Sequence, residues 1–360
     1  MITQVLSGVG DKPRLKPAPP CALRTAEAVL FHGAAGFFPQ ALKPCSSTVV
    51  PAVFPQPVKP RSSIVFSQFG LIALLLAAAA LSTAQESVPS ALQPAIHRLM
   101  AGKSGAVVVV NVASGRILAK SHLEVAAQRL AKPGSTLKPF VLMELLSSGR
   151  VKPEQKLMCR RPLYVGGRRM DCAHPEGVET LDAPDAIAYS CNSYFAAVAN
   201  RLSSDELALV FRRAGFTSQP HLAPIEAAGV VARAQSESEL QLQVLGHWGI
   251  EVTPLELLAA YRNLALQKLR SQHLGSAAPV FDGLVRAIRY GVAHPAQPHK
   301  TTAAGKTGTA SGANTQRTHG FFVGYSPADR PEIAIVVYLE QGRGIDAAAI
   351  AGKVLDAYWK

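Results

Sequence analysis

The segment AKPGSTLKPF, residues 131–140, places a serine, Ser135, three residues before a lysine, Lys138, and the apolar run VLMELL follows it. Residues 135–149 are apolar nearly all round, so they predict a buried helix that ends at Gly149. Side chains three residues apart share one face of a helix, so Lys138 is expected beside the Ser135 hydroxyl. A serine hydroxyl attacks a carbonyl only with a base in reach, and burial can lower the pKa of a lysine enough to make it that base. The segment therefore predicts a serine nucleophile at the start of a core helix.

A second motif, YSCNSYF at residues 189–195, supplies Ser190 and Asn192 with one residue between them. In a tight loop both side chains can face one cavity, where Ser190 can relay a proton and Asn192 can hold a substrate amide. The intervening residue, Cys191, is interpreted as a small buried side chain and not as a second nucleophile.

A third motif, AGKTGTA at residues 304–310, lies at the start of a predicted strand. Lys306 is expected to bind a substrate carboxylate and to lower the pKa of Lys138, and Thr307 to hydrogen-bond the same carboxylate. Gly308 would let a substrate lie along the strand edge, and the backbone N–H groups of Thr309 and of the nucleophilic serine would form an oxyanion hole. Each short motif is common alone, but the three in this order and spacing form a specific pattern.

The chain from residue 85 onward predicts one mixed α/β unit. A hairpin is expected at 105–121, where two β-rich runs flank a turn, and a helix at 252–266, which opens with a capping box. Two neighbouring strands are expected at 318–327 and 332–342, followed by a closing helix at 346–359. The order of hairpin, helices, strands and final helix predicts an α+β fold.

The composition is that of a folded protein with a basic surface. Of the 360 residues, 48% are hydrophobic and 17% are charged, which allows a sizeable core, and the formal net charge is +13. Lysines and arginines occur mostly singly or in pairs, without the motifs or interleaved aromatic residues of a nucleic-acid binder. We therefore predict a solvated basic surface and no nucleic-acid partner.

The N-terminal region resembles an export signal in an unusual place. Residues 1–57 are rich in proline without apolar periodicity, and we expect them to be disordered or a mis-annotated leader, with translation beginning near Val58. Residues 58–84 contain two cations, an apolar run and small residues before a cleavage site after Ala84, as in a signal peptide. An uncleaved membrane anchor is the alternative. Either interpretation predicts an exported protein, periplasmic or on the outer face of the cytoplasmic membrane, whose folded domain is residues 85–360.

The cysteines outside this leader are Cys159, Cys172 and Cys191. Cys159 and Cys172 flank a Gly166-Gly167 pair that could turn a hairpin and bring their sulfurs together, and export permits a disulfide. The alternative is that they are two unrelated small side chains. The histidines look isolated, so no metal site is expected.

The motifs STLK, SCN and KTG resemble the motif set of penicillin-binding proteins and serine β-lactamases. KPGSTLKPF, AYSCNSYF, VTPLELLAAYRNLA, GKTGTA and THGFFVGYSP extend the likeness to the transpeptidase domain of class B penicillin-binding proteins, in the same order. One departure is GHWGIEV, where a Gly-Gln-Gly-like turn would be expected, and we expect His247 and Trp248 to pack this loop.

The resemblance implies a fold and an activity. The fold would be a five-stranded antiparallel sheet packed against helices, with the active site between the sheet edge and an all-helical lobe. Ser135 would be acylated by a D-alanyl-D-alanine stem peptide of peptidoglycan, release the terminal D-alanine and pass the acyl group to an amine of a neighbouring strand. β-Lactams would trap the same serine, other cell-wall synthesis proteins would be partners, and no cofactor would be needed.

Three other functions remain open at this stage. A D,D-carboxypeptidase or a β-lactamase would pass the acyl group to water, although no glutamate between the second and third motifs has the Glu-Pro-X-X-Asn context of class A β-lactamases. A β-lactam sensor or scaffold would keep the fold without turnover.

Overall fold

The computed structural model describes residues 88–271, 273–311 and 317–360. The expected leader at 1–57 and the expected signal or anchor at 58–84 lie outside these residues. None of the helices in the described ranges combines the length and the apolar character needed to span a membrane.

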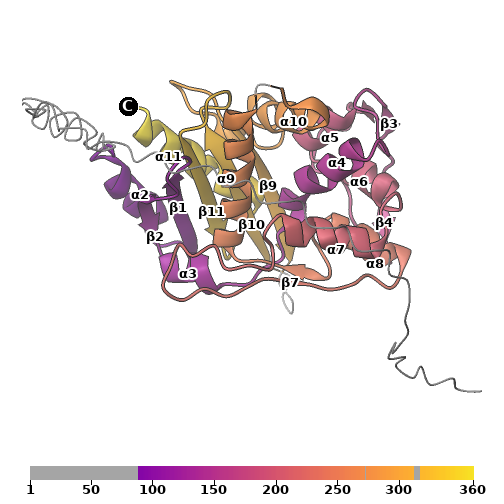
Figure 1. Ribbon diagram of the computed structural model, residues 1–360, viewed down its shortest axis with the longest axis horizontal. Helices are drawn as coiled ribbons and strands as arrows, with labels where there is room; N and C mark the ends of the chain where they lie inside the picture. The colour runs from indigo at the N-terminus through magenta and orange to yellow at the C-terminus, as the bar shows by residue number, and fades with distance from the viewer. Residues whose placement is uncertain (1–87, 272, 312–316) are drawn as a thin grey trace, which may run out of the picture. The chain divides into compact units, whose positions relative to one another are not determined.

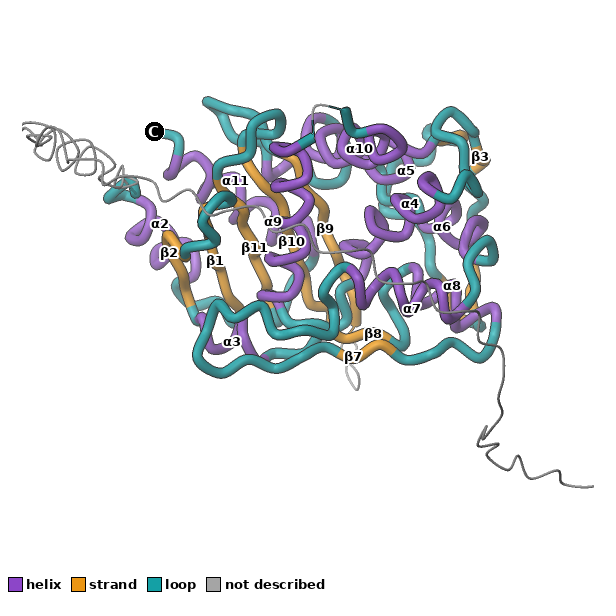
Figure 2. Tube along the Cα trace, viewed as in Figure 1, coloured by secondary structure: helices purple, strands orange, loops and turns teal. Residues whose placement is uncertain are grey.

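A five-stranded antiparallel sheet forms one part of the fold (Figures 1 and 2). Its strands, in spatial order, are β2 (Ile117–Ser121), β1 (Gly105–Asn111), β11 (Ile333–Leu339), β10 (Thr318–Ser326) and β9 (Ala304–Ser311). The predicted hairpin is β1 and β2, and the two predicted neighbouring strands are β10 and β11, which pair from Gly320 opposite Leu339 to Ser326 opposite Ile333. Strand β9, with the third motif, lies at one edge of the sheet.

Both faces of the sheet are covered by helices. Alternate residues of β1 point into different cores: Val108 and Val110 into one, Val107 and Val109 into the other. Helices α3 (Leu123–Gln128) and α9 (Pro254–Arg270) pack on the first face, and α2 (Leu92–Met100) and α11 (Gly344–Tyr358) pack on the second. Burial on both faces explains why β1 is a continuous apolar run and does not alternate with polar residues.

A predominantly helical lobe lies beside strand β9. It contains α4 (Lys138–Ser147), α5 (Ala183–Ala188), α6 (Asn192–Ala199), α7 (Ser204–Arg213), α8 (Glu237–Val244) and α10 (Ala278–Arg289). Short strand pairs add to it: β3 (Leu157–Met158) with β6 (Thr180–Leu181), and β4 (Tyr164–Val165) with β5 (Arg168–Arg169), turned at Gly166-Gly167 as the sequence predicts. A third pair, β7 (Val230–Val231) with β8 (Ile250–Glu251), lies nearer the sheet. The α+β architecture with a five-stranded antiparallel sheet and helices is confirmed.

The helix predicted at 135–149 begins differently from the expectation. Residues Gly134–Leu137 form a single 3-10 turn, η1, and the α-helix α4 begins only at Lys138, with Pro139 in its first turn. A proline is accepted there because its missing N–H has no partner inside the helix at that position. Helix α9 has the expected capping box, in which Thr253 and Glu256 exchange hydrogen bonds.

Candidate active site

The nucleophile turn η1 packs directly against the backbone of strand β9. Gly134 has a left-handed φ of 55°, and a Cβ there would lie 2.8 Å from the carbonyl oxygen of Thr309. A Cβ on Gly308 would lie 2.3 Å from the carbonyl oxygen of Pro133. Two glycines, one on each segment, therefore allow the two backbones to approach. The side of Gly308 on which a Cβ would point is occupied by the nucleophile turn, and the expected room for a substrate along the strand edge stays a prediction.

Two further segments hold η1 in place. The hydroxyl of Tyr261, on α9, donates a 2.8 Å hydrogen bond to the carbonyl of Thr136, and the N–H of Gly134 donates a 3.1 Å bond to the carbonyl of Gly246. Ser135 is half-buried and lines a cleft, whereas Thr136 points into the protein. The nucleophile is thus carried on a turn that is fixed from the sheet, from α9 and from the GHWG loop.

Lys138 joins the first motif to the second. Its side chain is fully buried, and its Nζ donates hydrogen bonds to the Ser190 carbonyl at 2.8 Å, to Ser190 Oγ at 3.3 Å and to Asn192 Oδ1 at 2.7 Å. Ser190 has a left-handed φ of 54° just after α5, and Asn192 begins α6. The loop between these helices therefore presents both polar side chains to the lysine.

Lys306 joins the third motif to the same serine. It is also fully buried, and its Nζ donates to Ser190 Oγ at 2.8 Å and to its neighbour's carbonyl, that of Thr307, at 3.1 Å. Ser190 Oγ accordingly lies between two lysine side chains. A hydroxyl in this position can pass a proton from one amine toward a substrate on the cleft side.

Burial controls the protonation of both lysines. It lowers the pKa of Lys138 from 10.5 to about 8, against the opposing influence of the Cys191 and Cys172 thiols. Burial, and then the charge of Lys138, lowers the pKa of Lys306 well below its ordinary value. Lys306 was expected to lower the pKa of Lys138, but the shift of Lys138 comes from burial, and it is the charge of Lys138 that helps to lower the pKa of Lys306. A substrate carboxylate beside Lys306 would raise the pKa of Lys306 again.

Asn192 is engaged by the protein at both ends of its amide. Besides accepting from Lys138, it donates from Nδ2 to the Met170 carbonyl at 2.9 Å and to the Asp171 carbonyl at 3.3 Å, and its backbone N–H donates to Cys172 Sγ at 3.1 Å. The expected contact with a substrate amide would thus compete with these internal bonds. The segment around residue 171 fixes the second motif from the side opposite Lys138.

A cleft of about 560 Å³ brings the predicted residues together. Ser135, Ser190, Asn192, Thr307 and Thr309 all line it, and Lys138 and Lys306 lie directly behind Ser190. The roles of these residues toward a substrate, including the oxyanion hole at Thr309, remain predictions.

The cleft also contains residues that the sequence did not identify. His247 was expected to pack its loop, but it lines the cleft, and burial together with the charge of Lys138 lowers its pKa to about 4. Cationic side chains line the cleft as well, from Lys132, Arg168 and Arg343. The GHWG loop, whose Gly246 lies against the nucleophile turn, was the available signal for His247. Arg168 and Arg343 lie outside the motifs, and Lys132 belongs to KPGSTLKPF but was assigned no role.

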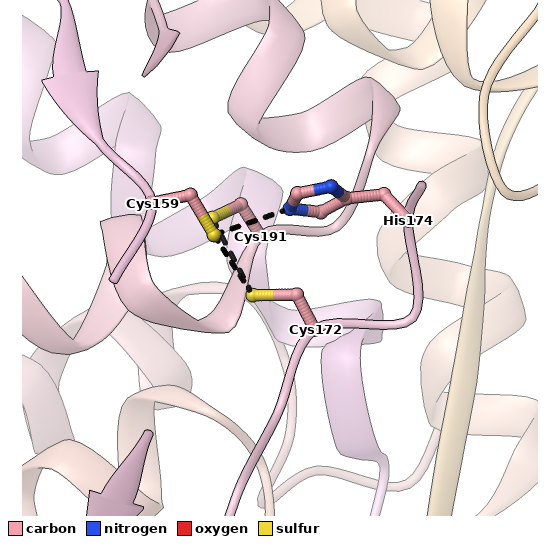
Figure 3. A group of neighbouring side chains, drawn as sticks. All are labelled: Cys159, Cys172, His174 and Cys191. Carbon is pink, nitrogen blue, oxygen red and sulfur yellow. Dashed lines mark hydrogen bonds between the residues drawn. The ribbon is translucent and has the colours of Figure 1, made fainter. Parts of the chain in front are cut away.

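The cysteines lie in one cluster behind the second motif (Figure 3). Cys159 and Cys172 are both free, with their sulfurs 3.6 Å apart, so the predicted disulfide is not formed in this structure although its two partners are neighbours. Cys191 lies 3.6 Å from Cys172, and His174 Nε2 lies 3.5 Å from Cys159 Sγ. His174 thus belongs to a four-residue group and is not isolated.

Comparison with known proteins agrees with this geometry. Residues 105–357 match the model of the penicillin binding protein transpeptidase domain. The chain is 25% identical over 357 residues to the peptidoglycan D,D-transpeptidase MrdA of Acinetobacter baumannii, covering 76% of this chain and 53% of that protein. It is 25% identical over 268 residues to the peptidoglycan D,D-transpeptidase PbpA of Mycobacterium tuberculosis, covering 62% and 54%. The chain therefore spans about half the length of these curated relatives.

A solved structure shows the same fold. The crystal structure of Pseudomonas aeruginosa PBP2 in complex with WCK 5153 aligns with a TM-score of 0.64 at 23% identity, covering 75% of this chain and 74% of that chain. Since the family model spans most of the folded part of the sequence, and the fold is that of a penicillin-binding protein, the chain belongs to the penicillin-binding protein transpeptidase domain family.

Proposed function

We propose that this protein is a serine D,D-transpeptidase that acts on D-alanyl-D-alanine stem peptides of peptidoglycan and is acylated by penicillin. The observation that carries the proposal is the hydrogen-bonded chain Lys138–Ser190–Lys306 at a cleft that Ser135 also lines. The names of the relatives, which are peptidoglycan D,D-transpeptidases, support the same substrate class.

The reaction follows from the arrangement of the three motifs. Neutral Lys138 accepts the proton of Ser135 Oγ as the oxygen attacks the carbonyl of the penultimate D-alanine. The proton then passes through the Ser190 hydroxyl to the leaving nitrogen, the peptide bond breaks, and D-alanine departs. The amine of a second stem peptide attacks the serine ester, its proton returns through the same groups, and Ser135 Oγ is released.

Substrate binding is proposed for the residues of β9 and the second motif. Lys306 and Thr307 would hold the terminal carboxylate, Asn192 would bind the substrate amide, and the N–H groups of Ser135 and Thr309 would bind the developing oxyanion. We further propose an exported protein that acts at the outer face of the cytoplasmic membrane or in the periplasm, alongside other cell-wall synthesis proteins. The signal-like segment at 58–84 supports this location.

Incubation with a labelled penicillin, followed by intact mass and peptide mapping, tests the assignment. We expect one adduct, on Ser135, that Ser135→Ala abolishes and that Ser147→Ala, a serine at the exposed end of α4, leaves unchanged. Absence of an adduct, or labelling of Cys191, would contradict the proposal.

Turnover separates the related functions. A D-alanyl-D-alanine peptide should yield a cross-linked product when an amine acceptor is present. Release of D-alanine without cross-linking would identify a carboxypeptidase, rapid loss of the penicillin adduct a β-lactamase, and a stable adduct without peptide turnover a sensor or scaffold.

A further inference from the structure

Four metal-binding side chains converge directly behind the second catalytic motif. Cys159, Cys172, His174 and Cys191 each offer one ligand atom, and all four atoms lie within 4.8 Å of one another (Figure 3). Three of these residues are buried and Cys159 is half-buried. They come from two separate parts of the chain: three from residues 159–174 and one from between Ser190 and Asn192.

The distances fit a tetrahedral metal centre. With zinc–sulfur bonds of about 2.3 Å and zinc–nitrogen bonds of about 2.0 Å, tetrahedral angles place two sulfurs about 3.8 Å apart and a sulfur and a nitrogen about 3.5 Å apart. Cys172 Sγ is 3.6 Å from both Cys159 Sγ and Cys191 Sγ, and His174 Nε2 is 3.5 Å from Cys159 Sγ. A disulfide would require two of these sulfurs to move to about 2.0 Å and would leave the other two ligands unused.

The groups around the cluster suit thiolate ligands. The backbone N–H of Asn192 donates to Cys172 Sγ at 3.1 Å, and that of Tyr194 donates to Cys191 Sγ at 3.4 Å. Three thiolates and a neutral imidazole around a divalent ion would carry a net charge of −1, and the guanidinium of Arg161, which contacts His174, would offset it. The cluster therefore has both hydrogen-bond donors and a compensating cation.

The imidazole can present the required nitrogen. His174 Nδ1 lies 3.0 Å from the Pro175 carbonyl, so an Nδ1–H tautomer would donate to that oxygen and leave Nε2 to the metal. Arg161 also lies 2.7 Å from Nδ1 and 3.2 Å from Nε2, and both contacts would have to open on metal binding, while its 2.8 Å bond to the His174 carbonyl can remain.

We propose that Cys159, Cys172, His174 and Cys191 form a tetrahedral Zn²⁺ site that ties the 159–174 segment to the loop carrying Ser190 and Asn192. The ligand set of three sulfurs and one nitrogen, with no position left for water, is that of a structural zinc site and not of a catalytic one. The site is not recognisable from the sequence because its ligands are spaced 13, 2 and 17 residues apart, unlike the close pairs of a zinc finger.

The metal would act on catalysis by positioning. The carbonyls of Met170 and Asp171, which hold the Asn192 side chain, directly precede Cys172. Loss of the metal would free this segment and loosen Asn192, which in turn accepts a hydrogen bond from Lys138. Zinc removal should therefore lower both stability and the rate of acylation, although the metal contacts no substrate.

Metal analysis of the full chain tests the site without any substrate. On a Cys21→Ser/Cys45→Ser background the remaining cysteines all belong to the cluster. We expect one zinc per chain, and after chelation and loading with Co²⁺ the visible spectrum of a tetrahedral cobalt–thiolate centre. Zinc should also raise the midpoint of thermal unfolding of the chelated protein.

Ligand variants with a matched control localise the metal. Cys159→Ser and His174→Asn should weaken zinc binding by more than the ~10- to 100-fold that outer partners typically contribute, and should change the cobalt spectrum. His294→Asn, an exposed histidine that contacts the Ile288 carbonyl, should have no effect. If a variant does not fold, the cobalt spectrum of the Cys21→Ser/Cys45→Ser protein still shows whether the cluster binds a metal.

Two results would overturn the inference. One is a folded protein that binds neither zinc nor cobalt stoichiometrically. The other is a Cys159–Cys172 disulfide in the native protein, found by alkylation and mapping, with no metal bound. The outcome is separable from the proposed function: a protein that binds zinc but never reacts with penicillin refutes the transpeptidase, and a reactive protein without metal refutes only the site.

Discussion

Lys138 is a lysine without access to solvent whose three hydrogen-bond acceptors are all neutral. A carboxylate partner would have kept it protonated, whereas neutral acceptors leave burial as the dominant influence and lower its pKa to about 8. A base with a pKa near the working pH combines a useful fraction of neutral amine with a useful affinity for the proton. The reactivity of Ser135 therefore depends on the lack of a carboxylate partner for Lys138 among the residues that the structure describes as much as on the neutral acceptors that Lys138 has.

The rate of acylation should rise with pH through about 8 and then level off, because only neutral Lys138 accepts the serine proton. Lys138→Ala should slow acylation by roughly 10²- to 10⁴-fold and remove this pH dependence. Stopped-flow acylation with a chromogenic penicillin measures both. Lys353→Ala, an exposed lysine on α11, is the control, and a pH profile of Lys138→Ala that still rises through 8 would refute the assignment.

Stability has the matching pH dependence. The folded pKa of about 8 lies below the ordinary value of 10.5, so between these values the unfolded chain binds more protons than the folded one. The destabilisation that comes from burying Lys138 therefore has its full value below pH 8. It decreases as the pH rises from about 8 to 10.5, so the free energy of unfolding increases over this range.

At the scale of elements, the active site depends on how η1 is held between β9 and α9. The close approach to β9 is allowed by Gly134 and Gly308, and α9 is linked to η1 by the hydrogen bond from Tyr261 to the Thr136 carbonyl. Both groups of that bond are buried, so neither can exchange its partner for water. Helix α9 thereby fixes a turn that is distant from it along the chain.

Tyr261→Phe should lower the free energy of unfolding by about 1–3 kcal/mol, because it leaves the buried Thr136 carbonyl without its donor, and should slow acylation. Tyr325→Phe is the matched control: Tyr325 is equally buried, and in the described part of the chain its hydroxyl has no hydrogen-bond partner. Chemical denaturation and penicillin acylation of both variants measure the difference. Equal effects of the two substitutions would show that the hydrogen bond does not position η1.

The elements also show what the sequence could and could not predict. The hairpin at β1–β2, the β10–β11 pair and the capped helix α9 follow from local periodicity and capping, which depend on near neighbours. The contact of Gly308 with Pro133 and the meeting of His174 with three cysteines join residues that are distant along the chain. Nothing local reveals that another backbone lies against Gly308 or that His174 meets the cysteines, so both contacts were missed.

At the largest scale, the folded unit surrounds its cleft with positive charge. Lys132, Arg168, Arg169 and Arg343 line it from three different segments, and Asp171 is the one acidic side chain among the described residues of the lining. Asp171 is already paired with Arg169, so the cleft keeps an excess of cations. Arg168, Arg169 and Arg343 are exposed, so they can act on an approaching substrate from a distance.

The cations should draw anionic substrates into the cleft, because charges that line a concave surface raise the local concentration of the opposite charge. Arg168→Gln should therefore lower the second-order rate constant of acylation by a carboxylate-bearing penicillin several-fold at low salt, and the effect should shrink as ionic strength rises. The acylation rate at saturating penicillin should stay unchanged, since Arg168 takes no part in proton transfer. Arg330→Gln removes the same charge from an exposed turn and is the control. An equal loss with both variants would assign the effect to net charge, and a loss that persists at high salt would make Arg168 a direct contact of the substrate.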